Sequence, residues 1–182
     1  ALPPTFDNIS GSTILSVAED ASVGTALETI SVSDPDSDPV TLSVSGTTDF
    51  GFDPGSTVLK VKAGLDYETD PTYSVTIVAT DVNSESATVI ITVNIEDKND
   101  HDPTLTVSTP DVTMDEEQAA GTSVPFVLSA SDTDTADGTS LTFSLSGADS
   151  SIFNINPSDG AVTLNTKLDI DPNSANAVYK PI

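Results

Sequence analysis

The sequence contains no cysteine and no tryptophan, and it has few basic residues and no long hydrophobic run. Without cysteine, the chain can form neither a disulfide framework nor a thiolate metal site. The longest apolar stretches, such as Val89-Ile90-Ile91, are far too short to cross a bilayer, and no signal peptide opens the chain. Because it begins Ala-Leu-Pro-Pro without a methionine, we expect a processed chain or a segment of a longer one.

The charge is strongly one-sided. Only 5 basic residues accompany 29 acidic ones, which gives a net charge of −24. The basic footprint of a nucleic-acid-binding protein is missing, and an anionic membrane surface would repel the chain. Cations are therefore the expected partners. Since the acids stand between short apolar runs and not in one block, a folded protein is favoured over disorder.

Alternation of apolar and polar residues is typical of β-strands. We predict two long strands at about residues 72–81 and 86–96. One face of the first carries Tyr73, Val75, Ile77 and Ala79, and the inward face of the second carries Ala87, Val89, Ile91, Val93 and Ile95. Strands of this kind bury one face and expose the other, as in antiparallel sandwiches. No stretch has a convincing helical period, so the predicted fold class is all-β.

An internal repeat has a period near 97 residues, the distance from Glu19 to Glu116 and from Gly24 to Gly121. The stretch "SVSDPDSD" returns as "SASDTDTAD", and "GLDYETDP" returns as "KLDIDPNS". We therefore predict two β-sandwich repeats, residues 1–101 and 102–182, joined at "DKNDHDP". The second repeat is too short for its last strands, so either the chain continues or another chain supplies a strand.

Carboxylates gather at strand ends and in the linker. If the two sandwiches stack end to end, six of them converge at the junction: Glu19, Asp66, Glu68, Asp100, Asp132 and Asp134. Two such charges about 4 Å apart repel by ~4 kcal/mol near a protein surface, and no basic cluster offsets this. Hard divalent cations would offset this repulsion, and Ca²⁺ accepts six to eight oxygen ligands. Zinc would require histidine or cysteine, and the chain has one histidine.

These motifs resemble a known family. "LDYE", "ATD", "DKNDHDP" and the paired Glu and Asp-x-Asp motifs are similar to those of the cadherin repeat, in the family's order and over nearly the whole chain. The resemblance implies tandem Greek-key sandwiches of immunoglobulin-like architecture, stacked end to end. It also implies two to three Ca²⁺ ions at the linker, residues 97–101.

Carried over by position, the resemblance implies side-chain ligands at Glu19, Asp66, Glu68, Asn99, Asp100, Asp132 and Asp134, and backbone carbonyl ligands at Lys98 and His101. The family usually has asparagine where His101 stands. Incomplete outer sites are implied at Asp34, Asp36, Asp81, Glu116, Asp169 and Asp171. Asp171 stands where the family prefers glutamate.

The acidic motifs admit other interpretations. A calcium loop of the EF-hand type from Asp132 fails because Phe143 occupies its twelfth position, where a glutamate is needed. His101 could serve a catalytic triad, but the sequence has no G-x-S-x-G motif, so we predict no catalytic residues and no enzyme. The alternatives are a secreted hydrolase with paired carboxylates, or a glycan- or receptor-binding module with structural calcium.

The expected function is that of a calcium-dependent adhesion module or structural rod, extracellular or on the cell surface, as part of a larger secreted or membrane-anchored protein. Expected partners are calcium and other protein chains, homophilic, heterophilic or neighbouring in a filament. Nucleic acid and direct membrane insertion are not expected. The triplet Asn8-Ile9-Ser10 predicts a glycosylation site.

Overall fold

The structure is a computed structural model that describes residues 1–108, 111–134 and 141–168. The chain divides into unit 1, Ala1–Asp100, and unit 2, His101–Ile182. Among the described residues, no helix is long and apolar enough to cross a membrane. The prediction of an all-β fold is confirmed, because strands make up the regular structure of the described ranges apart from one short 3₁₀ helix, η1 (Ser150–Ile152).

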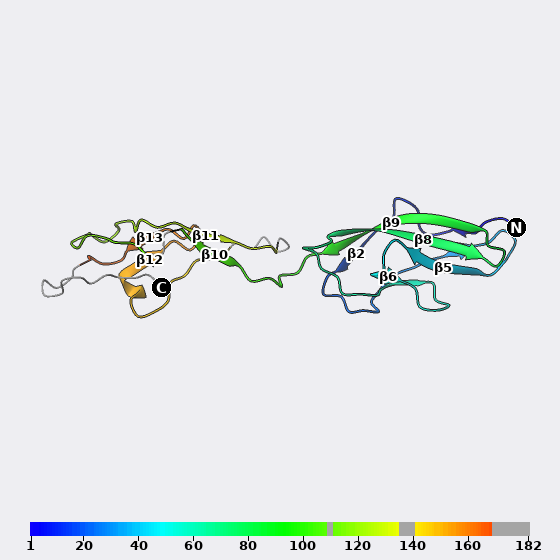
Figure 1. Ribbon diagram of the computed structural model, residues 1–182, viewed down its shortest axis with the longest axis horizontal. Coiled ribbons are helices and arrows are strands. Elements are labelled where there is room, and N and C mark those ends of the chain that lie inside the picture. The colour runs from blue at the N-terminus through cyan, green and yellow to red at the C-terminus, as the bar shows by residue number, and fades with distance from the viewer. Residues whose placement is uncertain (109–110, 135–140, 169–182) are drawn as a thin grey trace. The chain divides into compact units, whose positions relative to one another are not determined.

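Unit 1 is a sandwich of two main sheets (Figure 1). Its nine strands are β1 (Thr5–Phe6), β2 (Ile14–Ala18), β3 (Ala26–Thr29), β4 (Val32–Ser33), β5 (Val40–Ser45), β6 (Phe50–Gly51), β7 (Val58–Val61), β8 (Thr72–Asp81) and β9 (Ser86–Glu96). One sheet has the order β2-β9-β8-β5, the other the order β3-β7-β6, and β1 pairs with β4. Strand β2 runs parallel to β9, whereas β8 is antiparallel to both β9 and β5.

The two long strands predicted from sequence are confirmed with their bounds. Strands β8 and β9 pair from Thr72↔Asn94 to Thr80↔Ser86. The predicted inward residues of both strands are buried or half-buried, and their polar neighbours point outward. Hydrophobic alternation therefore determines which face of each strand enters the core.

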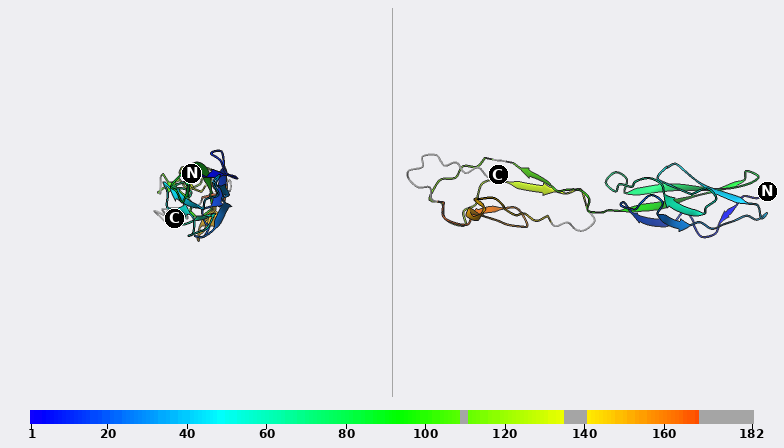
Figure 2. Two further views of the ribbon diagram at one scale, coloured as in Figure 1. Left: turned by 90° about the vertical axis from the view of Figure 1, so that its right-hand side faces the viewer. Right: turned by 90° about the horizontal axis from the view of Figure 1, so that it is seen from below.

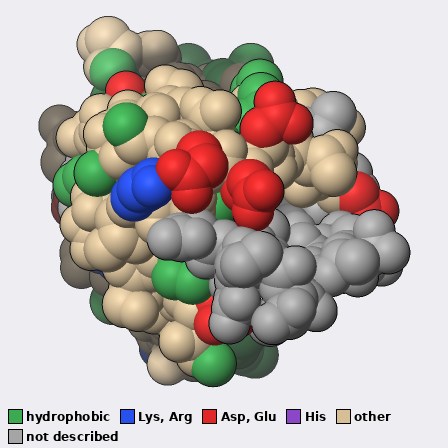
Figure 3. Space-filling view, turned by 90° about the vertical axis from the view of Figure 1, so that its left-hand side faces the viewer, with side chains coloured by type: hydrophobic (Ala, Val, Ile, Leu, Met, Phe, Trp, Pro, Cys, Tyr) green, Lys and Arg blue, Asp and Glu red, His purple; other side chains and the backbone are tan. Residues whose placement is uncertain are grey.

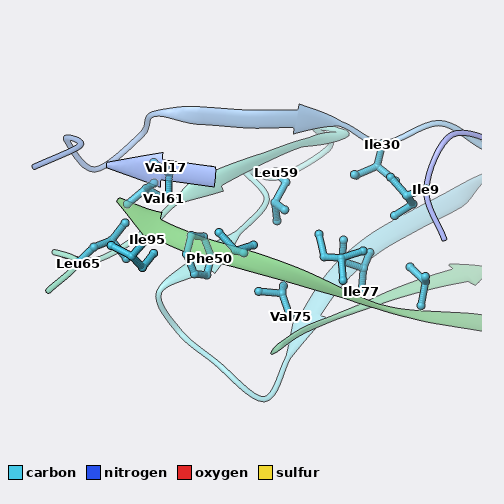
Figure 4. Packing of buried hydrophobic residues seen from close by; sticks show 13 residues of the cluster. Ile9, Val17, Ile30, Phe50, Leu59, Val61, Leu65, Val75, Ile77 and Ile95 are labelled. Carbon is cyan, nitrogen blue, oxygen red and sulfur yellow. The ribbon is translucent and has the colours of Figure 1, made fainter. Parts of the chain in front are cut away.

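The core of unit 1 lies between the two sheets. Figure 4 shows side chains of the two layers pointing toward one another, with Leu59 and Val61 from one sheet and Val75 and Ile77 from the other. Phe50 packs edge-on against the half-buried Tyr73, with ring centroids 5.1 Å apart. Burial of apolar surface, worth about 25 cal/mol per Å², supplies the main stabilisation in the absence of disulfides.

Unit 2 has shorter strands over its described residues (Figure 2). Strand β10 (Thr104–Val107) pairs with β11 (Leu128–Ser131), and β12 (Phe153–Ile155) pairs with β13 (Val162–Leu164). Its buried apolar residues are Val124, Val162, Leu164 and Leu168. All four residues of β10 are exposed, so this pair of strands contributes little to a core.

The same backbone pattern recurs in both units. Gly24 donates its N–H to the carbonyl of Val61 at 2.8 Å, and Gly121 donates to the carbonyl of Leu164 at 2.7 Å. Both glycines have positive φ, 97° and 87°, a conformation that other residues rarely adopt. The glycines that mark the sequence repeat thus make equivalent turns.

Candidate metal sites

Carboxylates lie at both ends of the sandwich in unit 1. Strands β2 and β9 are parallel, so both end at the same edge, where Glu19 and the linker residues follow them. The loop between β7 and β8 adds Asp66 and Glu68 there. At the opposite end β8 stops at Asp81, beside the start of β5. Two acidic clusters result, which we name the Glu19 cluster (Glu19, Asp66 and Glu68) and the Asp34 cluster (Asp34, Asp36 and Asp38).

The Glu19 cluster brings three carboxylates together, with ligand oxygens within 4.8 Å of one another. Glu19 itself is only 6% exposed. Its Oε2 accepts the backbone N–H of Tyr67 at 2.7 Å, and its Oε1 accepts the N–H of Lys98 at 2.5 Å. One buried carboxylate therefore ties the β7–β8 loop and the start of the linker to the end of β2.

The other two members of this cluster are also held in place. Asp66 accepts the N–H and the hydroxyl of Thr69, at 3.1 and 2.8 Å. Both carboxylate oxygens of Glu68 are shielded from solvent. The linker residues Asn99 and Asp100, which the resemblance assigns as ligands, are exposed.

Asp34 of the Asp34 cluster and Asp81 at the end of β8 share one unusual arrangement. Asp34 Oδ1 accepts the N–H groups of Asp36 and Asp38 at 2.8 and 3.1 Å. Asp81 Oδ1 accepts those of Asn83 and Glu85 at 2.8 and 2.9 Å. In both residues Oδ2 is buried and meets no hydrogen-bond partner among the described residues.

A side-chain contact joins the segments that carry these two carboxylates. Asn83 Nδ2 donates to Asp38 Oδ2 at 2.6 Å, which connects the turn after Asp81 to the Asp34 cluster. Burying a charged oxygen without a partner is costly unless a cation is supplied. A buried carboxylate oxygen of this kind, with other carboxylates nearby, fits a hard cation such as Ca²⁺.

In unit 2 the corresponding residues are Asp132 and Asp134, which follow β11. Asp134 is 3% exposed, and its N–H donates to Asp132 Oδ1 at 3.1 Å. His101 donates its N–H to Asp134 Oδ2 at 2.9 Å, as Leu2 donates to Asp36 Oδ2 in unit 1 at 2.6 Å. The Asp-x-Asp motifs of the two units are therefore built alike.

Sequence reasoning missed two features. It assigned no role to Asp38, although the spacing Asp-x-Asp-x-Asp was visible. It also gave His101 a role through its carbonyl alone, whereas ring Nδ1 lies 3.2 Å from Asp134 Oδ1. Only the fold brings these groups together, because 33 residues separate the histidine from the aspartate.

Three predicted outer ligands do not gain support from the described structure. Glu116, the sequence counterpart of buried Glu19, is exposed in a turn of unit 2. Asp169 and Asp171 lie outside the described residues.

The N-terminal ammonium group lies 3.9 Å from Asp36 Oδ2 in the Asp34 cluster, whereas three lysine side chains pair with carboxylates elsewhere. Lys60 and Lys62 both bind Asp53, at 2.7 and 2.5 Å, and these two ammonium groups lower the pKa of Asp53 to about 2. Lys167 pairs with Glu117 in unit 2. On the face of unit 2 drawn in Figure 3, a basic group lies beside acidic ones. These three lysines therefore pair with carboxylates outside both clusters.

Comparisons with known proteins show the family to which this fold belongs. The family model described as "Cadherin domain" matches residues 14–96, from the first residue of β2 to the last of β9. The solved structure of human Protocadherin-24 EC1-2 superposes with a TM-score of 0.77 at 30% identity, covering 96% of this chain and 82% of that one. The chain belongs to the cadherin family.

Curated relatives are far longer than this cadherin chain. Protocadherin-like wing polarity protein stan of Drosophila melanogaster is 30% identical over 170 residues, which cover 87% of this chain and 5% of the relative. Human Cadherin-related family member 2 is 33% identical over 152 residues, covering 82% of this chain and 11% of the relative. Cadherin proteins are adhesion modules and not enzymes, so the hydrolase alternative is wrong.

Proposed function

We propose that this cadherin chain is part of an extracellular adhesion or structural protein in which Ca²⁺ stiffens the joint between successive repeats. The proposed repeats are residues 1–101 and 102–182. The observation that carries the proposal of bound calcium is the burial of Asp34 Oδ2 and Asp81 Oδ2, at the end of unit 1 opposite the linker, where neither oxygen has a hydrogen-bond partner among the described residues. A chain of net charge −24 would not bury such atoms without a cation to offset them.

We place two to three further ions at the linker. Their proposed side-chain ligands are Glu19, Asp66, Glu68, Asn99, Asp100, Asp132 and Asp134, with carbonyl ligands from Lys98 and His101. Support comes from within each unit: the Glu19 cluster is preorganised by backbone N–H groups, and Asp134 is buried and fixed by His101. Bound calcium would neutralise these carboxylates and bridge their oxygens.

The proposed mechanism is linkage. Ions that bind only the aligned state stabilise it by RT ln(1 + [L]/Kd). Extracellular calcium modules commonly have Kd values of about 10⁻⁴ to 10⁻³ M, close to the concentrations that would switch the joint. Calcium would then control stiffness, and stiffness would set the reach of the protein toward other protein chains.

A substitution at Asp81 tests whether unit 1 binds calcium as proposed. In EGTA we expect Asp81→Asn to be at least as stable as the wild type, because the buried oxygen that lacks a partner loses its charge. In millimolar calcium we expect the wild type to be the more stable of the two, since only the wild type is stabilised by calcium bound at this site. Thermal unfolding in both buffers measures the effect, and calorimetric titration should show the loss of one site.

The exposed carboxylate of Asp111 gives a matched control. Asp111→Asn also replaces a carboxylate with a neutral amide, and its stability should respond to calcium as that of the wild type does. A calcium-induced stabilisation of Asp81→Asn equal to that of the wild type would contradict the assigned site.

A further inference from the structure

The triplet Asn8-Ile9-Ser10, which predicts a glycosylation site, lies where the N-terminal segment is attached to the rest of unit 1. Strand β1 pairs with β4, and a backbone hydrogen bond from Asp7 to the carbonyl of Ser31, at 2.9 Å, continues this pairing beyond the strands. Asn8 follows directly, opposite the connection between β3 and β4. The contacts of its side chain decide whether the triplet can carry a glycan.

The side chain of Asn8 uses both polar atoms of its amide on this connection. Nδ2 donates to the carbonyl of Thr29 at 2.7 Å, and Oδ1 accepts the N–H of Ser31 at 2.8 Å. These partners fix the orientation of the amide, because the reversed orientation would place oxygen against oxygen and N–H against N–H. The amide therefore acts as a further pair of backbone groups would in the ladder between the two segments. We call this pair of hydrogen bonds the Asn8 bridge.

The residues next to the Asn8 bridge belong to the core. Ile9 is 8% exposed and Ile30 is 1% exposed, and both are members of the buried cluster of unit 1. Figure 4 draws the two side chains at the same end of that cluster. Ile30 is the single residue between Thr29 and Ser31, so the bridge holds the backbone on both sides of a core residue. It thereby fixes the segment that carries Ile9 to the segment that carries Ile30.

The bridge and a glycan require the same position on Nδ2. The two bound backbone groups flank one residue and lie close together, so they meet the outer edge of the amide, opposite Cβ. The hydrogen on that edge is the one donated to Thr29. In an N-linked glycan the first sugar carbon replaces one Nδ2 hydrogen, and the resulting secondary amide favours the trans form, with the sugar opposite Cβ. The sugar would take the place of the hydrogen bond to Thr29.

We propose that Asn8 is a structural clamp for the N-terminal segment and that it carries no glycan in the folded chain. A glycan attached before folding would prevent the bridge, and the formed bridge would prevent attachment, so the two states exclude one another. Exposure alone gives the opposite expectation, because Asn8 is an exposed residue. The inference goes beyond the proposed function, since it requires neither calcium nor a partner chain.

Secretion of the full chain from eukaryotic cells tests the modification state. Mass spectrometry of the peptide that contains Asn8 should find it unmodified, with no change in mass on treatment with an N-glycosidase. Ser10→Ala is the reference, because it removes the triplet and leaves Asn8 in place, and its peptide should be equally unmodified. A folded, secreted wild-type chain with a detectable glycan on Asn8 would overturn the inference.

The clamp has a separate readout, hydrogen exchange of the Asp7 amide in unmodified chain from bacteria. The bond from Asp7 to Ser31 is the next one along the ladder, and substitution of Asn8 does not remove it directly. In Asn8→Ala we expect this amide to exchange about tenfold faster or more, because both hydrogen bonds of the bridge are lost. Asn8→Asp keeps the shape of the side chain but turns an oxygen toward the carbonyl of Thr29, so it should have a similar effect.

Ser10→Ala is again the matched control, since Ser10 is exposed and lies outside the bridge. Its Asp7 amide should exchange at the wild-type rate, and circular dichroism should show the same strand content in all variants. Exchange in Asn8→Ala and Asn8→Asp no faster than in Ser10→Ala would overturn the clamp, even if the triplet carried no glycan. Neither measurement depends on calcium, so the calcium proposal stands or fails separately.

Discussion

Glu19→Ala is expected to lower the free energy of unfolding of unit 1 by about 3 kcal/mol, because two backbone N–H groups lose a charged acceptor. Those groups belong to Tyr67 and Lys98, and the Glu19 side chain that binds them is only 6% exposed. Water would replace the carboxylate poorly in such a site. The substitution also removes one of three carboxylates from the Glu19 cluster, so we expect calcium affinity to fall with stability.

Chemical denaturation in EGTA measures the structural part of this effect, and calcium titration measures the ligand part. Asp20→Ala is a suitable control, since Asp20 is the exposed neighbour and carries the same charge. We expect it to change stability by less than about 0.5 kcal/mol. If the two variants behaved alike, the hydrogen bonds of Glu19 would not hold the loop and the linker as described.

Ile91→Ala is expected to cost unit 1 about 3 to 4 kcal/mol, through lost apolar burial and the cavity that remains. Ile91 is fully buried, at 0% exposure, in the centre of β9. Its neighbour Ile90 offers the control, because it is 53% exposed on the opposite face of the same strand. Ile90→Ala should cost less than about 1 kcal/mol. The same substitution at two adjacent isoleucines should therefore differ severalfold in the free energy of unfolding that it removes.

Equilibrium unfolding in denaturant, monitored by circular dichroism, distinguishes Ile91→Ala from Ile90→Ala. Because the chain has two units, the analysis should allow two transitions and assign the sensitive one to unit 1. Similar losses from both substitutions would show that the strand does not present its faces as the alternation predicts.

Much of this fold was predictable from sequence because hydrophobic alternation is a local signal. Strands β8 and β9 were located at their bounds, with the correct residues inward, since a one-residue error would expose the whole apolar set. The short strands were not located. Strands such as β1 and β4 have two residues each, and they exist because neighbouring strands offer hydrogen bonds and not because of a pattern of their own.

The candidate sites were predictable as a set of residues but not as geometry. Motif order identified Glu19, Asp34 and Asp81, yet nothing in the sequence indicated that backbone N–H groups hold one oxygen of each aspartate and leave the other buried. Asp38 and the ring of His101 were missed for the same reason, because their contacts depend on the folded chain. The convergence of six carboxylates on the linker stays a prediction.

Small-angle X-ray scattering of the full chain in calcium and in EGTA tests the central claim most directly, at concentrations low enough to keep the chain monomeric. We predict a narrow distribution of dimensions in calcium and a broader, on average more compact one in EGTA, because chelation frees the linker at residues 97–101. Circular dichroism should show in parallel that unit 1 stays folded. The same rigid distribution in both buffers would contradict the claim that calcium stiffens the joint.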